Sequence, residues 1–140
     1  MRKTTSPEAT KQLASTLAPY LRVGDVVVLE GDLGAGKTQF VQGVAAGLGI
    51  RDQVTSPTFN ILLSYPEGSL PLYHFDLYRL DEASQLEDVD FYGVTDPSAP
   101  GVALVEWASM FPDEMPEDAV RVRISRVPGD DAARVIEIER

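Results

Sequence analysis

The sequence predicts an α/β fold for its 140 residues: a mostly parallel sheet flanked by helices, with an antiparallel hairpin near the C-terminal end. Two short, continuously apolar runs, at residues 26–29 and 102–105, are typical of buried parallel strands. Residues 120–139 alternate between apolar and polar side chains on either side of a Pro-Gly-Asp-Asp turn, which is typical of a half-exposed hairpin. We expect one domain spanning residues 1–140, because a chain of this length builds one small core.

A first helix is predicted near the N-terminal end. Ser6 is a suitable N-cap because its hydroxyl can accept from an unpaired backbone N–H group, and Pro7 suits the first helical position. Leu13 and Leu17 are expected on the buried face of this helix, and Pro19 is expected to end it.

The middle of the chain is predicted to add two strands and one short helix. We expect strands near residues 59–63 and 72–77 and a helix near residues 82–87, with Asp81 as its cap. Residues 90–101 contain two prolines and two glycines and are expected to form a loop.

The most informative segment follows the first apolar run. Residues 31–38 match the pattern G-x-x-x-x-G-K-[ST] in full: Gly31-Asp32-Leu33-Gly34-Ala35-Gly36-Lys37-Thr38. Apolar residues then recur at helical spacing, at Phe40, Val41, Val44, Ala45 and Leu48. Strand, loop and helix in this order are the context that a phosphate-binding P-loop requires.

The residue types of this loop fit phosphate chemistry. Glycines allow backbone N–H groups to converge on phosphate oxygens, and the start of the helix adds its positive end. Lys37 would bring a positive charge to the β- and γ-phosphates, and the Thr38 hydroxyl would bind Mg²⁺. The predicted ligand is therefore a nucleoside triphosphate with magnesium.

A nucleoside triphosphatase also needs a carboxylate near Mg²⁺ and a group that orients the attacking water. Glu106 follows the apolar run 102–105, and Asp76 lies late in the predicted strand 72–77. Because ligands of open α/β sheets bind beyond the carboxyl ends of the strands, both are candidate catalytic residues. For Asp76, a purely structural role at a strand end is an equal alternative.

Other polar and aromatic residues have both a functional and a structural interpretation. Residues 55–58 could form a switch that senses the γ-phosphate, although a Ser-Pro turn that starts the next strand is the simpler interpretation. His74, the only histidine, is expected to be packed and hydrogen-bonded, and Trp107 to be at least half-buried. Arg79 is expected to pair with an internal carboxylate.

Charge and composition argue against several classes of protein. The formal net charge is −10, with 22 acidic against 12 basic residues, so autonomous binding to nucleic acid is not expected. The chain has no cysteine, which excludes disulfides and thiolate metal sites. The sequence contains neither a signal-peptide pattern nor an apolar run near the ~18 residues of a membrane span, so we expect a cytoplasmic protein that does not bind membranes.

Four segments, in this order, resemble motifs of the TsaE (YjeE) family: the loop 31–38, Ser-Pro-Thr-Phe at 56–59, His-Phe-Asp-Leu-Tyr-Arg-Leu at 74–80 and Val-Glu-Trp at 105–107. Members of this family are bacterial P-loop ATPases of the machinery that makes N6-threonylcarbamoyladenosine at position 37 of tRNAs reading ANN codons. The resemblance implies ATP and Mg²⁺ as cofactors and proteins of the TsaB and TsaD type as partners.

The resemblance also implies roles for individual residues. The phosphates of ATP would be held by the loop that starts at Gly31, through Leu33, Gly34, Ala35, Gly36, Lys37 and Thr38. Thr38 and Glu106 would bind Mg²⁺, and Asp76 would act with Lys37 and Glu106 near the γ-phosphate or the attacking water. The nucleotide-responsive switch would consist of Ser56, Pro57, Thr58 and Phe59. Arg134 and residues 6–8 would approach the base.

The resemblance implies slow, Mg²⁺-dependent hydrolysis of ATP, through which the protein would act on a TsaB–TsaD complex. The tRNA would be contacted only through that complex, and the threonylcarbamoyl group would be transferred elsewhere. A small P-loop kinase would need an acceptor pocket and an arginine-bearing lid, for which the chain has no insert. A GTPase would need an N-K-x-D motif, but the single asparagine, Asn60, is followed by Ile61. A nucleotide-responsive binding module, in which hydrolysis is incidental, is a further alternative.

Overall fold

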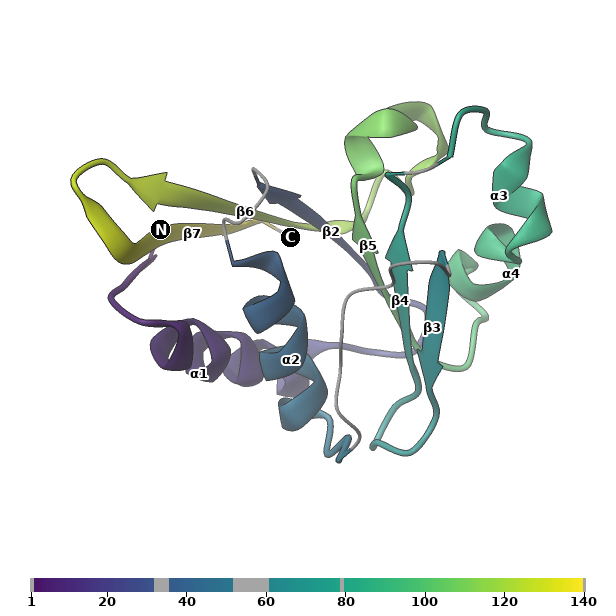
Figure 1. The fold of residues 1–140 in the computed structure, drawn as a ribbon. Coiled ribbons are helices and arrows are strands. Elements are labelled where there is room, and N and C mark those ends of the chain that lie inside the picture. Colours follow the sequence, from purple (N-terminus) through teal and green to yellow (C-terminus); the bar gives the residue numbers. More distant parts are fainter. Residues whose placement is uncertain (1, 32–35, 52–60, 79, 140) are drawn as a thin grey trace.

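The computed structural model describes residues 2–31, 36–51, 61–78 and 80–139. Within them, seven strands form one sheet with helices on both faces (Figure 1). The order of the strands across the sheet is β1-β7-β6-β2-β5-β4-β3. The strands are β1 (Arg2–Thr4), β2 (Val26–Gly31), β3 (Leu62–Tyr65), β4 (Leu72–Asp76), β5 (Val102–Glu106), β6 (Val120–Val127) and β7 (Asp130–Glu139).

The centre of the sheet is parallel and its two sides are antiparallel. Strand β2 pairs in parallel with both β5 and β6, and β5 pairs in parallel with β4. Antiparallel neighbours complete the sheet, with β7 and β1 on one side and β3 on the other. The predicted parallel sheet with a C-terminal antiparallel hairpin is confirmed, and the first strand of that hairpin is itself part of the parallel centre.

Each face of the sheet has its own pair of helices. Helices α1 (Pro7–Leu17) and α2 (Lys37–Gly47) cover one face, and α3 (Gln85–Asp88) and α4 (Phe91–Thr95) lie on the other, beside β4 and β3 (Figure 1). Short 3₁₀ helices are η1 (Ala18–Tyr20), η2 (Ala108–Met110) and η3 (Pro112–Glu114). Within the described ranges, no helix has the length and hydropathy needed to cross a membrane.

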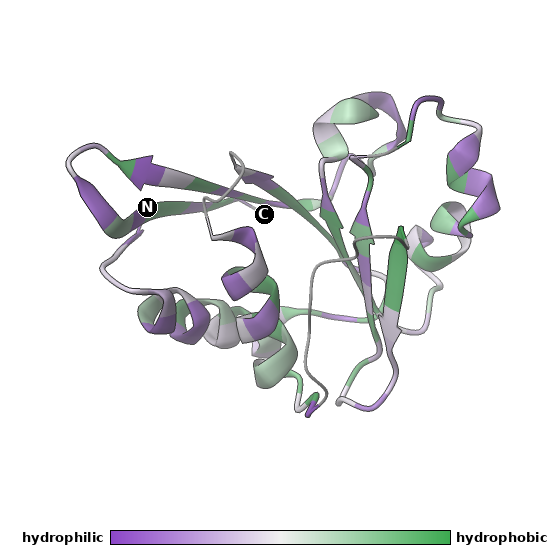
Figure 2. Ribbon diagram, in the orientation of Figure 1, coloured by the Kyte–Doolittle hydropathy of each residue, from purple (hydrophilic) through white to green (hydrophobic). Residues whose placement is uncertain are grey.

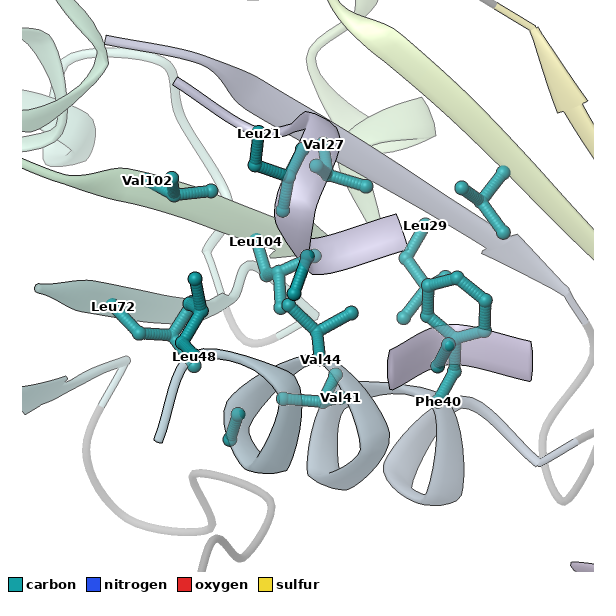
Figure 3. Packing of buried hydrophobic residues seen from close by; sticks show 14 of the residues in the cluster. Leu21, Val27, Leu29, Phe40, Val41, Val44, Leu48, Leu72, Val102 and Leu104 are labelled. Atoms are coloured by element: carbon teal, nitrogen blue, oxygen red, sulfur yellow. The ribbon is translucent and has the colours of Figure 1, made fainter. Parts of the chain in front are cut away.

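Two hydrophobic cores follow from this layering, because successive side chains of a strand point to opposite faces. On the α2 face, Phe40, Val44 and Leu48 point toward side chains of β2 and β5 such as Leu29 and Leu104 (Figure 3). On the other face, Val28, Phe75, Leu86, Phe91 and Val105 pack together. Hydropathy follows the same plan, with hydrophobic colour along the central strands and mixed colour along the β6–β7 hairpin (Figure 2).

The first helix begins and faces the core as predicted. The Ser6 hydroxyl accepts from the backbone N–H of Ala9 at 3.0 Å, and Pro7 is the first helical residue. Leu13 and Leu17 pack against the core and are partly buried, and Thr10 and Ala14 on the same face are buried more deeply. The physical reason is close contact with α2, since a Cβ atom on Gly43 would overlap the carbonyl oxygen of Lys11.

Of three other predictions of local structure, one was wrong and two are confirmed with shifted bounds. The helix predicted at 82–87 begins only at Gln85. The side-chain oxygen of Gln85 accepts from the backbone N–H groups of Asp81 and Glu82, so these two residues precede the helix, and Asp81 provides no cap. The predicted loop 90–101 contains α4, which is held by a ring contact between Phe91 and Phe75 at 5.2 Å. The strand predicted at 59–63 is β3, which lies slightly later in the chain.

The contact between α1 and α2 generates a prediction about Gly43. Helix propensity alone makes Gly43→Ala stabilising by about 1 kcal/mol. Because the added methyl group would overlap the α1 backbone, we expect Gly43→Ala to destabilise the fold by about 1–3 kcal/mol instead. Denaturant unfolding measures whether Gly43→Ala raises or lowers the free energy of unfolding. Ala46→Gly, at an exposed position of α2, is the matched control for propensity, and a stabilised Gly43→Ala variant would contradict this packing.

Candidate functional site

Three residues singled out from the sequence lie at one edge of the sheet. Gly31 ends β2, Glu106 ends β5 and Asp76 ends β4. These strands are parallel neighbours, with Leu29 opposite Glu106 and Glu106 opposite Asp76. The carboxyl ends of parallel strands are where α/β proteins bind ligands, so the structure brings both candidate carboxylates to the expected position.

The start of α2 lies at the same edge. Gly36 adopts a left-handed conformation, with φ of 103°, and caps the helix, whose first two residues are Lys37 and Thr38. A Cβ atom at Gly36 would meet only ordinary van der Waals contacts, so the backbone angle and not space requires glycine here. Unpaired N–H groups and the helix dipole make such a helix start favourable for an anion.

The Lys37 side chain is buried against an aromatic ring. Lys37 is 7 % exposed, and its Nζ lies 4.2 Å from the centre of the Trp107 ring. Trp107 follows β5 with a left-handed backbone, φ 61°, and its ring also contacts that of Tyr78 at 4.8 Å. A cation over the face of an indole ring is attracted by the ring quadrupole. The sequence predicted a half-buried Trp107 but not its contact with the lysine of the loop.

Glu106 is held by a buried histidine. Glu106 is 4 % exposed and His74 is 0 % exposed, and His74 Nε2 lies 2.6 Å from Glu106 Oε2. His74 is therefore packed and hydrogen-bonded, as predicted. That its partner is Glu106 could not be read from the sequence, because the two residues are 32 positions apart on different strands.

Asp76 is a carboxylate whose pKa is raised. Burial is the main cause, and the nearby negative charge of Glu106 adds to it. A hydrogen bond from the Tyr78 backbone N–H to Asp76 Oδ1, at 3.0 Å, opposes the rise, as do the charges of His74 and Lys37. The charges of Glu106 and Lys37 thus both act on Asp76 at this edge. Such a group can bind a cation and position a water molecule.

The described residues contain no cluster of three or more His, Cys, Asp or Glu side chains suited to hold a metal. Mg²⁺ does not require one, because it is commonly bound by one or two carboxylates, substrate phosphates and waters. Glu106 and the Thr38 hydroxyl, at the start of α2, therefore fit the magnesium site that the sequence predicts.

Two cavities flank this edge. One, of about 360 Å³, is lined by Gly31, Lys37, Trp107 and residues of β6 that include Arg123. The other, of about 290 Å³, lies between the start of α1, the start of α2 and β7, and is lined by Pro7, Thr10, Gly36, Gln39, Asp131, Ala132 and Arg134. The second cavity brings Arg134 next to Gly36.

Hydrogen bonds fix the Arg134 side chain beside that cavity. Its Nη1 donates to the carbonyl oxygens of Asp131, at 2.6 Å, and Ala133, at 2.7 Å. The lining residues Thr10, Gln39 and Asp131 were not predicted, because their sequence positions carry no motif.

Several predicted residues lie outside the described part of the chain. These are Leu33, Gly34 and Ala35 of the loop, the predicted switch Ser56, Pro57, Thr58 and Phe59, and also Arg79. Their expected roles stay predictions.

The site has the three features that define the P-loop class of α/β proteins. A strand ends in a glycine, the following helix opens with Lys-Thr, and a carboxylate lies at the end of the neighbouring parallel strand. The sequence model of the family described as "Threonylcarbamoyl adenosine biosynthesis protein TsaE" matches residues 4–136. The chain belongs to the TsaE family.

Individual relatives agree with this assignment. The chain is 44% identical over 133 residues to the Bacillus subtilis tRNA threonylcarbamoyladenosine biosynthesis protein TsaE, which covers 95% of this chain and 81% of that protein. It is 43% identical to the Streptomyces coelicolor protein of the same name, over 89% of this chain and 84% of that protein. The crystal structure of Bacillus subtilis YdiB superposes with a TM-score of 0.74 at 40% identity, over 96% of this chain and 80% of that one.

The contact between Lys37 and Trp107 can be measured by a double-mutant cycle. We expect Lys37→Met and Trp107→Leu to couple by about 0.5–2 kcal/mol in the free energy of unfolding, the range of a desolvated cation–π pair. Lys11→Met, on the exposed part of α1, is the control and is expected to show no coupling to Trp107→Leu. A coupling of zero for Lys37 would show that the ring does not stabilise its charge.

The raised pKa of Asp76 has a consequence for stability. The folded state binds the proton of Asp76 more tightly than the unfolded state, so this residue stabilises the fold below its ordinary pKa of 3.8, and that stabilisation is lost as pH rises through the raised pKa. At neutral pH, Asp76→Asn is therefore expected to raise the melting temperature, since Asn keeps the oxygen that accepts from Tyr78. The gain should shrink as pH falls toward 3.8.

Asp96 is a matched control, because its pKa is shifted in the opposite direction to that of Asp76. Hydrogen bonds from Ser98 lower the pKa of this exposed carboxyl, so its charged form is favoured in the folded state. Asp96→Asn is therefore expected to lower the melting temperature at neutral pH, and the effect should fade as acid protonates Asp96. Equal responses of the two variants would contradict the assigned environments.

Proposed function

We propose that the chain is a Mg²⁺-dependent ATPase that supports formation of N6-threonylcarbamoyladenosine at position 37 of ANN-decoding tRNAs. The observation that carries this proposal is the shared edge of Lys37, Thr38 and Glu106 in a chain of the TsaE family. In this role it acts on a TsaB–TsaD complex and leaves transfer of the threonylcarbamoyl group to its partners. Since the complex on which it would act modifies tRNA, we place the protein in the cytoplasm.

The phosphate end of ATP is assigned to the start of α2. Backbone N–H groups at Gly36 and beyond, together with Leu33, Gly34 and Ala35, would face the phosphates, and Lys37 would supply the compensating charge. To reach a phosphate, the Lys37 ammonium exchanges its contact with the Trp107 ring for a contact with an anion. That exchange is favourable because a full negative charge attracts the ammonium more strongly than a ring quadrupole does.

The two carboxylates are assigned different tasks. Bound Mg²⁺ would polarise the terminal phosphate and neutralise charge that develops on it. Glu106 suits binding of this ion with Thr38, because its carboxylate is fixed in place by His74. Asp76 suits orientation of the attacking water, because its raised pKa makes it a better proton acceptor than an ordinary aspartate.

The nucleoside is assigned to the cavity beside Arg134. This cavity opens directly next to Gly36, and Pro7 and Ala132 give it apolar walls against which a flat base can pack. The guanidinium of Arg134, held by two carbonyl oxygens, offers a planar cation for stacking. Adenine is favoured over guanine because the sequence has no N-K-x-D motif.

The net charge supports an indirect role in handling tRNA. A protein with a formal charge of −10 gains little from counterion release on a polyanion. Contacts to tRNA are therefore assigned to TsaB- and TsaD-type partners, and the role proposed for this chain is to reset their complex by hydrolysing ATP.

Reconstituted tRNA modification tests the proposal. With TsaB- and TsaD-type partners, the chain is expected to hydrolyse ATP slowly alone, faster with the complex, and to permit many turnovers of tRNA modification. Lys37→Ala is expected to abolish this support, because the charge that compensates the phosphates is lost. Counts of modified tRNA per complex and phosphate release give both readouts.

Glu106→Ala separates binding from hydrolysis in the same assay. This variant is expected to keep nucleotide affinity within about tenfold while hydrolysis falls at least 100-fold, the scale of losing one charge-stabilising group. Full activity of Glu106→Ala would remove Glu106 from the site. Multi-turnover modification without the chain would contradict the proposed function.

A further inference from the structure

The position of His74 in the sheet is the starting point. His74 lies on β4 opposite Leu104 of β5, and the next register pair on the same face of the sheet, two residues toward the site, joins Asp76 to Glu106. Leu72 and Leu104 belong to the core on the α2 face, whereas Phe75 belongs to the other core. His74 therefore points to the α2 face, where its ring reaches diagonally across the sheet to Glu106.

We assign the hydrogen on His74 Nε2 from the chemistry of its partner. An ionised carboxylate only accepts hydrogen bonds, so His74 Nε2 donates to Glu106 Oε2 across their 2.6 Å separation. This holds for the neutral and for the charged ring. The other nitrogen, Nδ1, is buried without a hydrogen-bond partner among the described residues.

Packing alone does not account for a histidine at this position. Its neighbours on the α2 face include Leu72 and Leu104, and a leucine there would bury no polar nitrogen. An unpaired buried nitrogen lowers the stability of the fold. The feature that distinguishes His74 from a leucine is its hydrogen bond to the buried Glu106 carboxylate, which fixes the orientation of that group.

We propose that His74 is a positioning residue that orients the Glu106 carboxylate for Mg²⁺; this inference rests on the proposed ATPase function. Glu106 has three side-chain torsions, and the Nε2–H group of His74 restrains them by anchoring one carboxylate oxygen. A competing cation is close, since Lys37 lies over the ring of Trp107, the residue after Glu106. The anchored carboxylate is thereby kept available for the metal.

Three variants at one position separate the hydrogen bond from packing. In His74→Gln, the amide nitrogen can occupy nearly the place of Nε2 and donate to Glu106. In His74→Asn, the side chain is too short to reach, and in His74→Leu the donor is removed while the apolar volume is kept. The magnesium dependence of ATP binding is measured by titration calorimetry, in parallel with the magnesium dependence of hydrolysis.

We expect the Leu and Asn variants to require about 10–100-fold more Mg²⁺ than the wild type, the usual effect of losing a group that holds a metal ligand. The Gln variant should recover most of this loss. ATP affinity in EDTA should be the same for all four proteins, because in this proposal His74 acts only on the metal ligand. A merely structural histidine would change both affinities together.

The control is to test His74→Leu in a protein that already carries Glu106→Ala. In that background, His74→Leu is expected to leave the magnesium requirement unchanged, because the carboxylate that His74 orients is gone. Thermal unfolding verifies that each variant folds, and the comparison of Gln with Asn decides the question if the Leu variant does not fold.

Two results would overturn the inference while leaving the ATPase intact. One is a magnesium requirement of His74→Leu or His74→Asn equal to that of the wild type, and the other is a His74→Gln variant as impaired as His74→Leu. A wild-type protein that binds no ATP with Mg²⁺ would instead overturn the proposed function itself.

Discussion

The parallel pairing of β2, β5 and β4 is the constraint on which the rest of the structure depends. The register that sets Val28 opposite Val105, and Val105 opposite Phe75, also carries Glu106 and Asp76 to the end of the sheet where α2 begins. Because side chains alternate along a strand, a slip of one residue would turn Glu106 to the other face. The core thus sets the positions of the acidic groups, and the geometry of the site follows from the packing of Val, Leu and Phe.

Local patterns were enough to predict the central architecture. The apolar runs at 26–29 and 102–105 and the strand–loop–helix order around residues 31–38 are local patterns, for which sequence spacing is informative. Glu106 and Asp76 were predicted as site residues because strand ends can be recognised from where an apolar run stops. Their relative placement followed from the rule that parallel strands end at the same edge.

Features that depend on pairing over long distances could not be predicted in this way. The three residues of β1 contain too little pattern to be read as a strand, and β1 forms only because β7 lies beside it. The contact of Lys37 with Trp107 and the bond between His74 and Glu106 join residues from separate elements. The deep burial of Thr10 and Ala14 in α1 could not be predicted, because it follows from the close approach of α1 to α2 at Gly43.

The strand order also has a consequence for folding during synthesis. Strand β2, from the first quarter of the chain, finds its two neighbours only in β5 and β6, at residues 102–106 and 120–127. Strand β1 pairs with β7, which spans residues 130–139. Until a ribosome has released these later segments, β2 has two unpaired edges. Folding of the sheet is therefore expected to wait for them and to be comparatively slow, because its central contacts join distant parts of the sequence.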